Sequence, residues 1–466
     1  DLGTLDDKTL SLAAQAARRL QSAAVLALSR EDLLASGGYV LRALALTPEG
    51  EVRDDLLTVG CEALLSSGDV ARGAPVVDEL TERSNDPRLK AWADCFRAQL
   101  WSLTDSERLV EASELADGAA DRLSSLGDDA GVAKARLVRA LILARLGRVG
   151  DCEAELDLAL GAARAAGDRR RTVAVLGAAP LAALWGPSPV ARAGGRCLDV
   201  LRLLRITTSS PAVEATSIRC QGMLEALRGR FDSARAKFEM SRTMARDLGL
   251  RHGLYETELF EGFAELLAGD PVAAEPHLVL ARDGLGALGI GADAGQASAL
   301  LARALLRQGR TDEADVLASA ALEAAGENRQ TAVASRSVLG EIRVEQGRPD
   351  EARQLIAAAL EIVERMDITI DHAIAQRSAA RVADRLGDAN DAQSHRAAAE
   401  RLLADKGVTG LTEARSERTV ADASERGTTA AEGEVPRAAM VPPNRAWDVN
   451  EGLWSTWIAG DRSGYL

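Results

Sequence analysis

The sequence predicts an all-α protein, a right-handed α-solenoid of about ten helix pairs. Its 466 residues exceed the size at which one hydrophobic core stops growing, about 250 to 300 residues. Aromatic residues make up only 3% of the chain although 47% is hydrophobic, so Leu, Ala and Val must fill the interior, which favours closely packed helices. A glycine motif also recurs about every 40 residues, as in a repeat array.

The repeated motif is a Gly followed by Arg or Asp, with Ala five residues after the Gly. Clear copies are spaced by 40, 40, 38 and 40 residues and begin at Gly229, Gly269, Gly309, Gly347 and Gly387. Looser copies begin at Gly147, with Cys152 in the Ala position, and at Gly68, with Gly73 in that position. Degenerate copies fall near Glu31, Glu107 and Pro187, which gives about ten units.

Each unit is predicted to contain two helices. The first carries apolar residues at helical spacing and ends at the motif Gly, which can take the left-handed conformation that ends a helix. The second begins two to four residues later, as at Pro349, a residue suited to a first helical turn. Its small Ala allows close approach of the first helix. Such a pair cannot bury its apolar face alone, so stacking predicts a tetratricopeptide-like solenoid over residues 1–407.

The chain changes character after this array. Residues 408–443 are rich in Thr, Ser, Glu, Arg and Ala and are predicted to form a flexible linker, because they bury too little surface to offset their ordering entropy. Residues 444–466 are predicted to form a short helix or the truncated start of another domain. The spacing of Trp447, Trp454 and Trp457 places them on one helical face, a candidate partner surface.

Charge and cysteine content limit the partners and the compartment. Seventy acidic residues against 56 basic ones, a net charge of −14, disfavour binding to nucleic acid or to an anionic membrane. No apolar stretch is long enough to span a bilayer. Five separated cysteines without a C-x-x-C pair indicate reduced buried thiols, so we expect a cytoplasmic protein.

The sequence motifs for chemistry point away from an enzyme. None of the five lysines follows a Gly, which excludes a phosphate-binding P-loop. Gly284, Gly286 and Gly289 match the dinucleotide fingerprint, but they follow a helical run where the fingerprint needs a strand. The four histidines lack metal-ligand spacing, and no nucleophile elbow is present. We therefore expect no catalytic, cofactor-binding or metal site in this chain.

A candidate binding groove follows from the repeat. First helices line the concave side of such solenoids. Polar residues recur eleven positions before the motif Gly, and the unit around residue 260 adds a local aromatic excess. The candidate groove residues are Tyr255, Glu258, Ser298, Arg336 and Gln376. A ligand-reading groove and a merely solvated face both fit this pattern.

Four short segments carry a family resemblance: LGTLDDKT at residues 2–9, RALxLxP from Arg42, LLSSGD at residues 64–69 and AxERLLADKG at residues 398–407. They resemble segments of bacterial, actinobacterial-type signalling proteins. These resemble the helical-repeat half of proteins in which an adenylate/guanylate cyclase domain precedes an AAA-like signal-transduction NTPase and then a tetratricopeptide-like array. The repeat region of LuxR-type ATP-dependent regulators is similar. The chain begins at Asp1 instead of Met, which favours a part of a longer protein.

This resemblance implies a regulatory function. We expect a non-catalytic sensor or scaffold that binds a protein, peptide or small effector in the groove and regulates an upstream NTPase and cyclase. ATP would bind only in those upstream domains. The alternative is the effector-sensing region of a LuxR-type transcriptional activator, although the helix-turn-helix that ends such regulators is not recognisable here.

Overall fold

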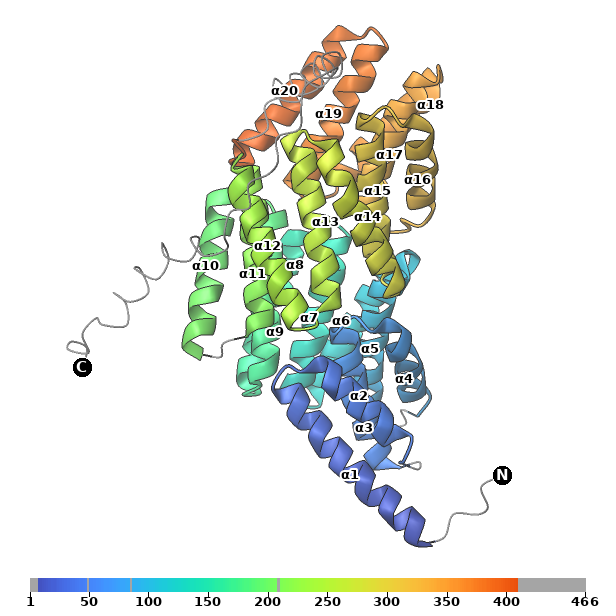
Figure 1. Cartoon of the computed structure of the whole chain (residues 1–466), viewed down its shortest axis with the longest axis vertical. Helices are drawn as coiled ribbons and strands as arrows, with labels where there is room; N and C mark the ends of the chain where they lie inside the picture. Colours follow the sequence, from blue (N-terminus) through green and yellow to red (C-terminus); the bar gives the residue numbers. More distant parts are fainter. Residues whose placement is uncertain (1–6, 48–49, 84–85, 208–209, 410–466) are drawn as a thin grey trace, which may run out of the picture. The chain divides into compact units, whose positions relative to one another are not determined.

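Twenty α-helices form the described part of the chain. The computed structural model describes residues 7–47, 50–83, 86–207 and 210–409, and in these ranges it contains no strand and one short 3-10 helix, η1 (Ser106–Arg108). Successive helices pack as ten pairs (Figure 1). The predicted all-α solenoid of tetratricopeptide-like pairs is therefore confirmed.

The first helices of the pairs are α1 (Asp7–Ser29), α3 (Glu51–Ser66), α5 (Pro87–Thr104), α7 (Asp129–Arg145), α9 (Arg169–Trp185), α11 (Pro211–Leu227), α13 (Arg251–Ala268), α15 (Gly291–Arg307), α17 (Arg329–Glu345) and α19 (Thr369–Arg385). The second helices are α2 (Leu33–Leu44), α4 (Val70–Arg83), α6 (Leu109–Ser125), α8 (Val149–Ala165), α10 (Val190–Thr207), α12 (Phe231–Asp247), α14 (Pro271–Ala287), α16 (Thr311–Glu323), α18 (Pro349–Val363) and α20 (Ala389–Lys406).

The motif glycines end the first helices as predicted. The five clear copies, from Gly229 to Gly387, have φ values between 72° and 81°, in the left-handed region that favours glycine. Glu31, a degenerate copy, adopts φ 62° despite its side chain. The other two degenerate copies, near Glu107 and Pro187, also lie between the helices of a pair.

The small residue five positions after each motif Gly lies where the two helices of a pair touch. In the five clear copies this Ala is at most 1% exposed. In the first and third units the same position holds Ser36 and Ala112, both fully buried, and in the fourth it holds Cys152, 2% exposed. A small side chain at this position lets the paired helices approach closely.

The ten pairs wind into two superhelical turns that pack directly on one another. Hydrogen bonds join residues 217 to 222 positions apart, which is about five and a half repeats. The carboxylate of Asp367 accepts from the backbone N–H groups of Val149, at 2.7 Å, and Gly150, at 2.6 Å. The Lys406 ammonium donates to the carbonyls of Leu184, at 2.8 Å, and Gly186.

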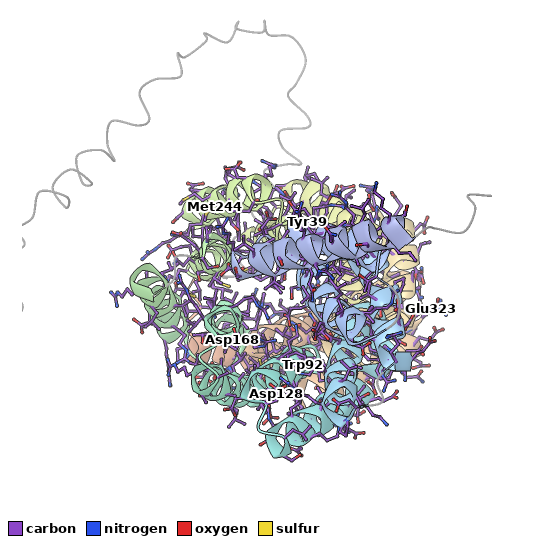
Figure 2. The ribbon with its side chains drawn as sticks, turned by 90° about the horizontal axis from the view of Figure 1, so that it is seen from below. Tyr39, Trp92, Asp128, Asp168, Met244 and Glu323 are labelled. Carbon is purple, nitrogen blue, oxygen red and sulfur yellow. The ribbon has the colours of Figure 1, made fainter. Side chains whose placement is uncertain are left out.

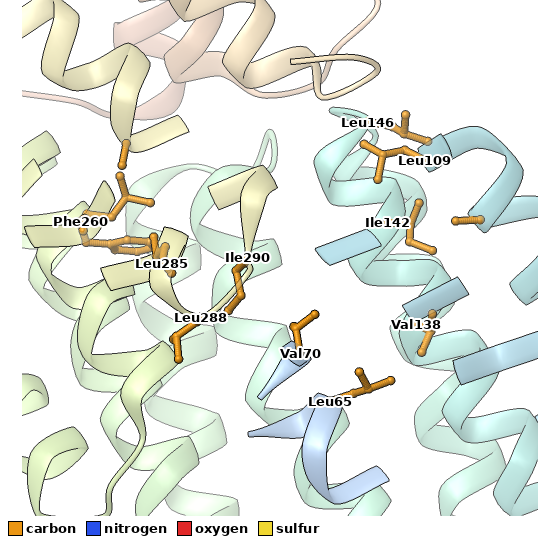
Figure 3. Close-up of a cluster of buried hydrophobic side chains, with 14 of the residues drawn as sticks. Leu65, Val70, Leu109, Val138, Ile142, Leu146, Phe260, Leu285, Leu288 and Ile290 are labelled. Atoms are coloured by element: carbon orange, nitrogen blue, oxygen red, sulfur yellow. The ribbon is translucent and has the colours of Figure 1, made fainter. Parts of the chain in front are cut away.

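The hydrophobic core crosses the boundary between these turns. One cluster of buried side chains contains residues of both turns, and Figure 3 shows Val70 from the first near Leu288 and Ile290 from the second. The solenoid therefore has a continuous core in addition to the contacts between neighbouring repeats.

Three remaining predictions concern membrane spans, the state of the cysteines and the structure of the C-terminal region. Every helix in the described ranges is too short or too polar to cross a bilayer. The five cysteines are buried free thiols. The predicted linker beyond residue 409 and the helix with Trp447, Trp454 and Trp457 lie outside the described residues.

Candidate functional site

Three cavities with shared walls run through the superhelix, and together we call them the central channel. The mouth, about 1230 Å³, is lined by turns between helices, including Asp168 at its rim (Figure 2). Glu31, Arg170, Ala212 and Leu250 line both the mouth and a second cavity, the chamber, of about 460 Å³. The chamber shares walls with a third cavity of about 30 Å³, the inner pocket, through Trp185, Phe263, Gln296, Leu300 and Gln330.

The first helices supply most of the chamber wall. Alternate helices from α3 to α17 contribute residues, so both superhelical turns face the same cavity. The lining follows the repeat in several units. Lys134, Glu256 and Gln296, each thirteen residues before a motif Gly, line the chamber.

Aromatic and aliphatic side chains form the apolar part of the chamber. Trp185 of α9, in the first turn, packs its ring against Phe260 of α13, in the second, with centroids 5.4 Å apart and an edge-on geometry. Its centroid also lies 6.0 Å from that of Phe263. Leu181 and Leu259 extend this wall. A ligand in the chamber would therefore touch apolar groups from both turns.

A cluster of charged side chains lies between mouth and chamber. The buried Glu62 carboxylate is 3.1 Å from the Lys134 ammonium and 3.0 Å from the Arg170 guanidinium, and Arg171 lies 3.6 Å away. Burial alone would raise the pKa of Glu62, but these three cations outweigh it and hold the pKa well below its ordinary value. Arg171 also pairs with Asp168, and Glu31 attracts Arg170, so acidic and basic groups are balanced at this point of the channel.

A second charged group joins the two turns inside the chamber. Asp293 of α15 forms an ion pair with Arg145 of α7. Its Oδ2 atom also lies 3.3 Å from His252 Nε2. Burial opposes the charge on His252, but Glu256 and Asp293 outweigh it and raise the pKa of the imidazole. His252 and Asp293 both belong to the second turn, so the pair of Arg145 with Asp293 is the link between the turns in this group.

The inner pocket contains an arginine without a partner. Arg303 is 8% exposed and forms no hydrogen bond or ion pair in the described residues, although it lines the pocket. Asp371 lines the same pocket and accepts a 2.9 Å hydrogen bond from the Gln330 amide. Burial raises the pKa of Asp371 to about 6.

None of the five candidate groove residues lines the central channel. Four of them lie two residues after the channel-facing position, which is about 200° around a helix. This side of the first helix faces second helices instead. Glu258 accepts from Arg242 of α12, at 2.7 Å, and contacts His277 of α14, while Gln376 contacts His395 of α20.

The remaining candidates have local contacts. The Ser298 hydroxyl donates to the carbonyl of Ala294, one turn back, and Arg336 is half-buried. The Tyr255 ring lies over Gly284, where an added Cβ would come within 2.3 Å of it. Gly284, part of the apparent dinucleotide fingerprint, lies inside α14, where its lack of a side chain makes room for this tyrosine.

Within the described residues, one group of side chains has ligand atoms close enough for a metal ion: Glu258, Glu261 and His277. The Arg242 guanidinium pairs with both carboxylates, so their negative charge already has a cationic partner. We assign it to packing between α12, α13 and α14.

Sequence reasoning missed the channel residues, although the repeat carried a signal for them. A comparison of several first helices at the position thirteen residues before each motif Gly would have found Lys134, Glu256 and Gln296. The pairing of α9 with α13 across the turns had no such signal.

No protein-family model matches the chain, and no curated protein matches it by sequence. Among solved structures it is similar to NprR in complex with its cognate peptide NprX, with a TM-score of 0.53 and 11% identity over 74% of this chain and 99% of that chain. Apo NprR from B. thuringiensis (TM-score 0.46, 13% identity, covering 74% and 98%) and a Rap protein complexed with Competence and Sporulation Factor (0.43, 12%, 86% and 100%) are more distant. At 11% identity the likeness to the NprR complex concerns the fold alone.

Proposed function

We propose that the central channel is an effector site and that this region is a non-catalytic sensor and scaffold. The observation that carries the proposal is a chamber of about 460 Å³ with apolar walls and charged groups. This is the usual character of a pocket for a peptide or small organic molecule. Lys134 and Arg170, which line the chamber beside Glu62, supply hydrogen-bond donors for acceptor groups of a ligand.

The same geometry supplies a way to transmit binding. Walls from α7 and α9 belong to the first superhelical turn, and walls from α13 and α15 belong to the second. A ligand that bridges them favours one arrangement of the turns, because it shifts the population towards the state that it binds more tightly. A partner that touches both turns would sense the change.

The partner that we propose is an upstream NTPase joined to an adenylate/guanylate cyclase, and we propose that ATP binds in those domains. The proposal is supported by the resemblance of the segments around residues 2–9 and 398–407 to such proteins. The gene sequence immediately upstream tests it, because an absent NTPase and cyclase would refute this context. A helix-turn-helix in the full-length protein, with specific DNA binding, would favour the alternative, a LuxR-type activator.

The channel itself is tested by blocking it. Ala174 is exposed and lines the chamber, so Ala174→Trp adds bulk to the channel without entering the core. Ala357→Trp, on an exposed position of α18 that does not line the channel, is the matched control. Affinity selection with mass spectrometry, using random pentapeptides and a pool of small organic acids, should recover ligands with the wild type and the control only. Equal recovery by Ala174→Trp would refute the channel as the site.

A further inference from the structure

Arg303 is the starting point, because a buried guanidinium normally has partners. Burying an unpaired charge is costly, so buried arginines are almost always paired or hydrogen-bonded. Arg303 is 8% exposed, its Nε is buried without a hydrogen-bond partner, and no ion pair forms between it and any described residue. Burial lowers its pKa to about 10, so it remains charged at neutral pH.

The neighbouring acids are already engaged. Glu341 is held by two other arginines, Arg307 at 2.8 Å and Arg381 at 2.9 Å. Asp371 is held by the Gln330 amide and forms no ion pair with Arg303. With Arg303, this end of the channel has three arginines against two acids, so one positive charge is left for a partner from outside.

The space at Arg303 has the size of a small anionic group. The inner pocket has about 30 Å³, enough for about two water-sized groups. A carboxylate has two oxygens of that size. The pocket also opens to the apolar chamber through Trp185, Phe263 and Leu300. A ligand can therefore fill the chamber with its apolar body and reach Arg303 with one end.

We propose that the inner pocket binds the carboxylate of the effector, with the Arg303 guanidinium as its partner and the apolar body of the effector in the chamber. The planar guanidinium fits a carboxylate with two parallel hydrogen bonds. The inference rests on the proposed function of the channel. It adds to that function the chemical class of the ligand, an amphipathic carboxylic acid. It also adds the orientation of the ligand, with its carboxylate in the inner pocket and its apolar body in the chamber.

The test compares acids with their amides. One arm uses random pentapeptides with a free C-terminal carboxylate against the same pool amidated. The other arm uses octanoate against octanamide, which separates a peptide terminus from a small organic acid. Binding is measured to the wild type, to Arg303→Met, and to Arg282→Met as a control for loss of a half-buried arginine outside the channel.

In at least one arm the wild type and Arg282→Met should prefer the acid by about tenfold to a hundredfold, the usual value of a hydrogen bond to a charged group. Arg303→Met should bind acid and amide within about twofold of each other. It should also melt close to the wild type, because Arg303 forms no hydrogen bond or ion pair with any described residue. Arg303→Lys, which keeps the charge, should retain part of the preference for the acid over the amide. It replaces Arg303→Met in the test if Arg303→Met does not fold.

Equal binding of acid and amide by the wild type would overturn the inference, as would an undiminished preference in the Arg303 variants or failure of both acids to bind. Ala174→Trp separates this result from the proposed function. If that variant loses both acid and amide while the wild type does not distinguish them, the channel binds ligands but Arg303 does not select a carboxylate.

Discussion

The contact between superhelical turns predicts a specific effect of Asp367→Ala. Asp367 precedes α19, and its carboxylate accepts from the first two N–H groups of α8, on Val149 and Gly150. It therefore caps a helix 218 residues away in sequence. The substitution removes this cap without altering the packing inside either repeat.

The magnitude follows from the groups that lose a partner. Loss of a capping side chain costs about 1 kcal/mol, and loss of a negative charge at a helix N-terminus adds about 0.3 to 1 kcal/mol. Val149 is 1% exposed, so water cannot easily replace the bond to its N–H, whereas Gly150 is exposed. We expect a total of about 1 to 2 kcal/mol, all of it at the boundary between the turns.

Hydrogen exchange is the suitable assay, because a long repeat protein need not unfold in one step. Exchange at the start of α8 and of α19 should accelerate about fivefold to thirtyfold in Asp367→Ala. The control is Asp270→Ala, which removes a cap of 2.9 Å to Ala273 within its own helix, α14. It should accelerate exchange in α14 and leave α8 and α19 unchanged. Unchanged exchange in α8 on Asp367→Ala would refute the packing of the turns.

Three further predictions concern the core and the channel charges. Ala314→Leu should overpack its helix pair and cost about 1 to 3 kcal/mol in thermal unfolding, whereas Ala357→Leu on the surface should not; an unchanged melting temperature in both would contradict the repeat register. Glu62→Gln should cost about 3 to 5 kcal/mol because Lys134 stays buried and unpaired. Since the pKa of Glu62 is lowered, its contribution is present above its ordinary value of 4.5 and is lost as pH falls, so denaturation curves of wild type and variant should converge in acid. Asp371 has a raised pKa of about 6, so the stability of the wild type relative to Asp371→Asn should fall as pH rises through 6; a pH-independent difference would contradict this.

The helix pairs were predictable because their signals are local. A Gly that ends a helix and a small residue five positions later are both set by contacts within one unit, as at Gly309 and Ala314. Even Glu31, which stands where other units have the motif Gly, could be assigned to the end of a first helix by counting repeats. The structure gives it the same left-handed conformation.

The channel could not be predicted in the same way. The contacts of Asp367 with Val149 and of Lys406 with Gly186 depend on the superhelical pitch. The pitch is the sum of small rotations between successive repeats. The choice of helix face also had to be known to within two residues. A stripe through Glu258 faces a second helix, whereas a stripe through Glu256 faces the channel.

The most direct test of the effector site is a hydrogen-exchange footprint of a ligand recovered by the affinity selection, measured on the wild type. Binding in the central channel predicts slower exchange in the first helices that line it, above all in α7, α9, α13 and α15, from both turns. Protection confined to second helices such as α12, α14 and α16 would place the ligand on the outer face of the solenoid and contradict the account.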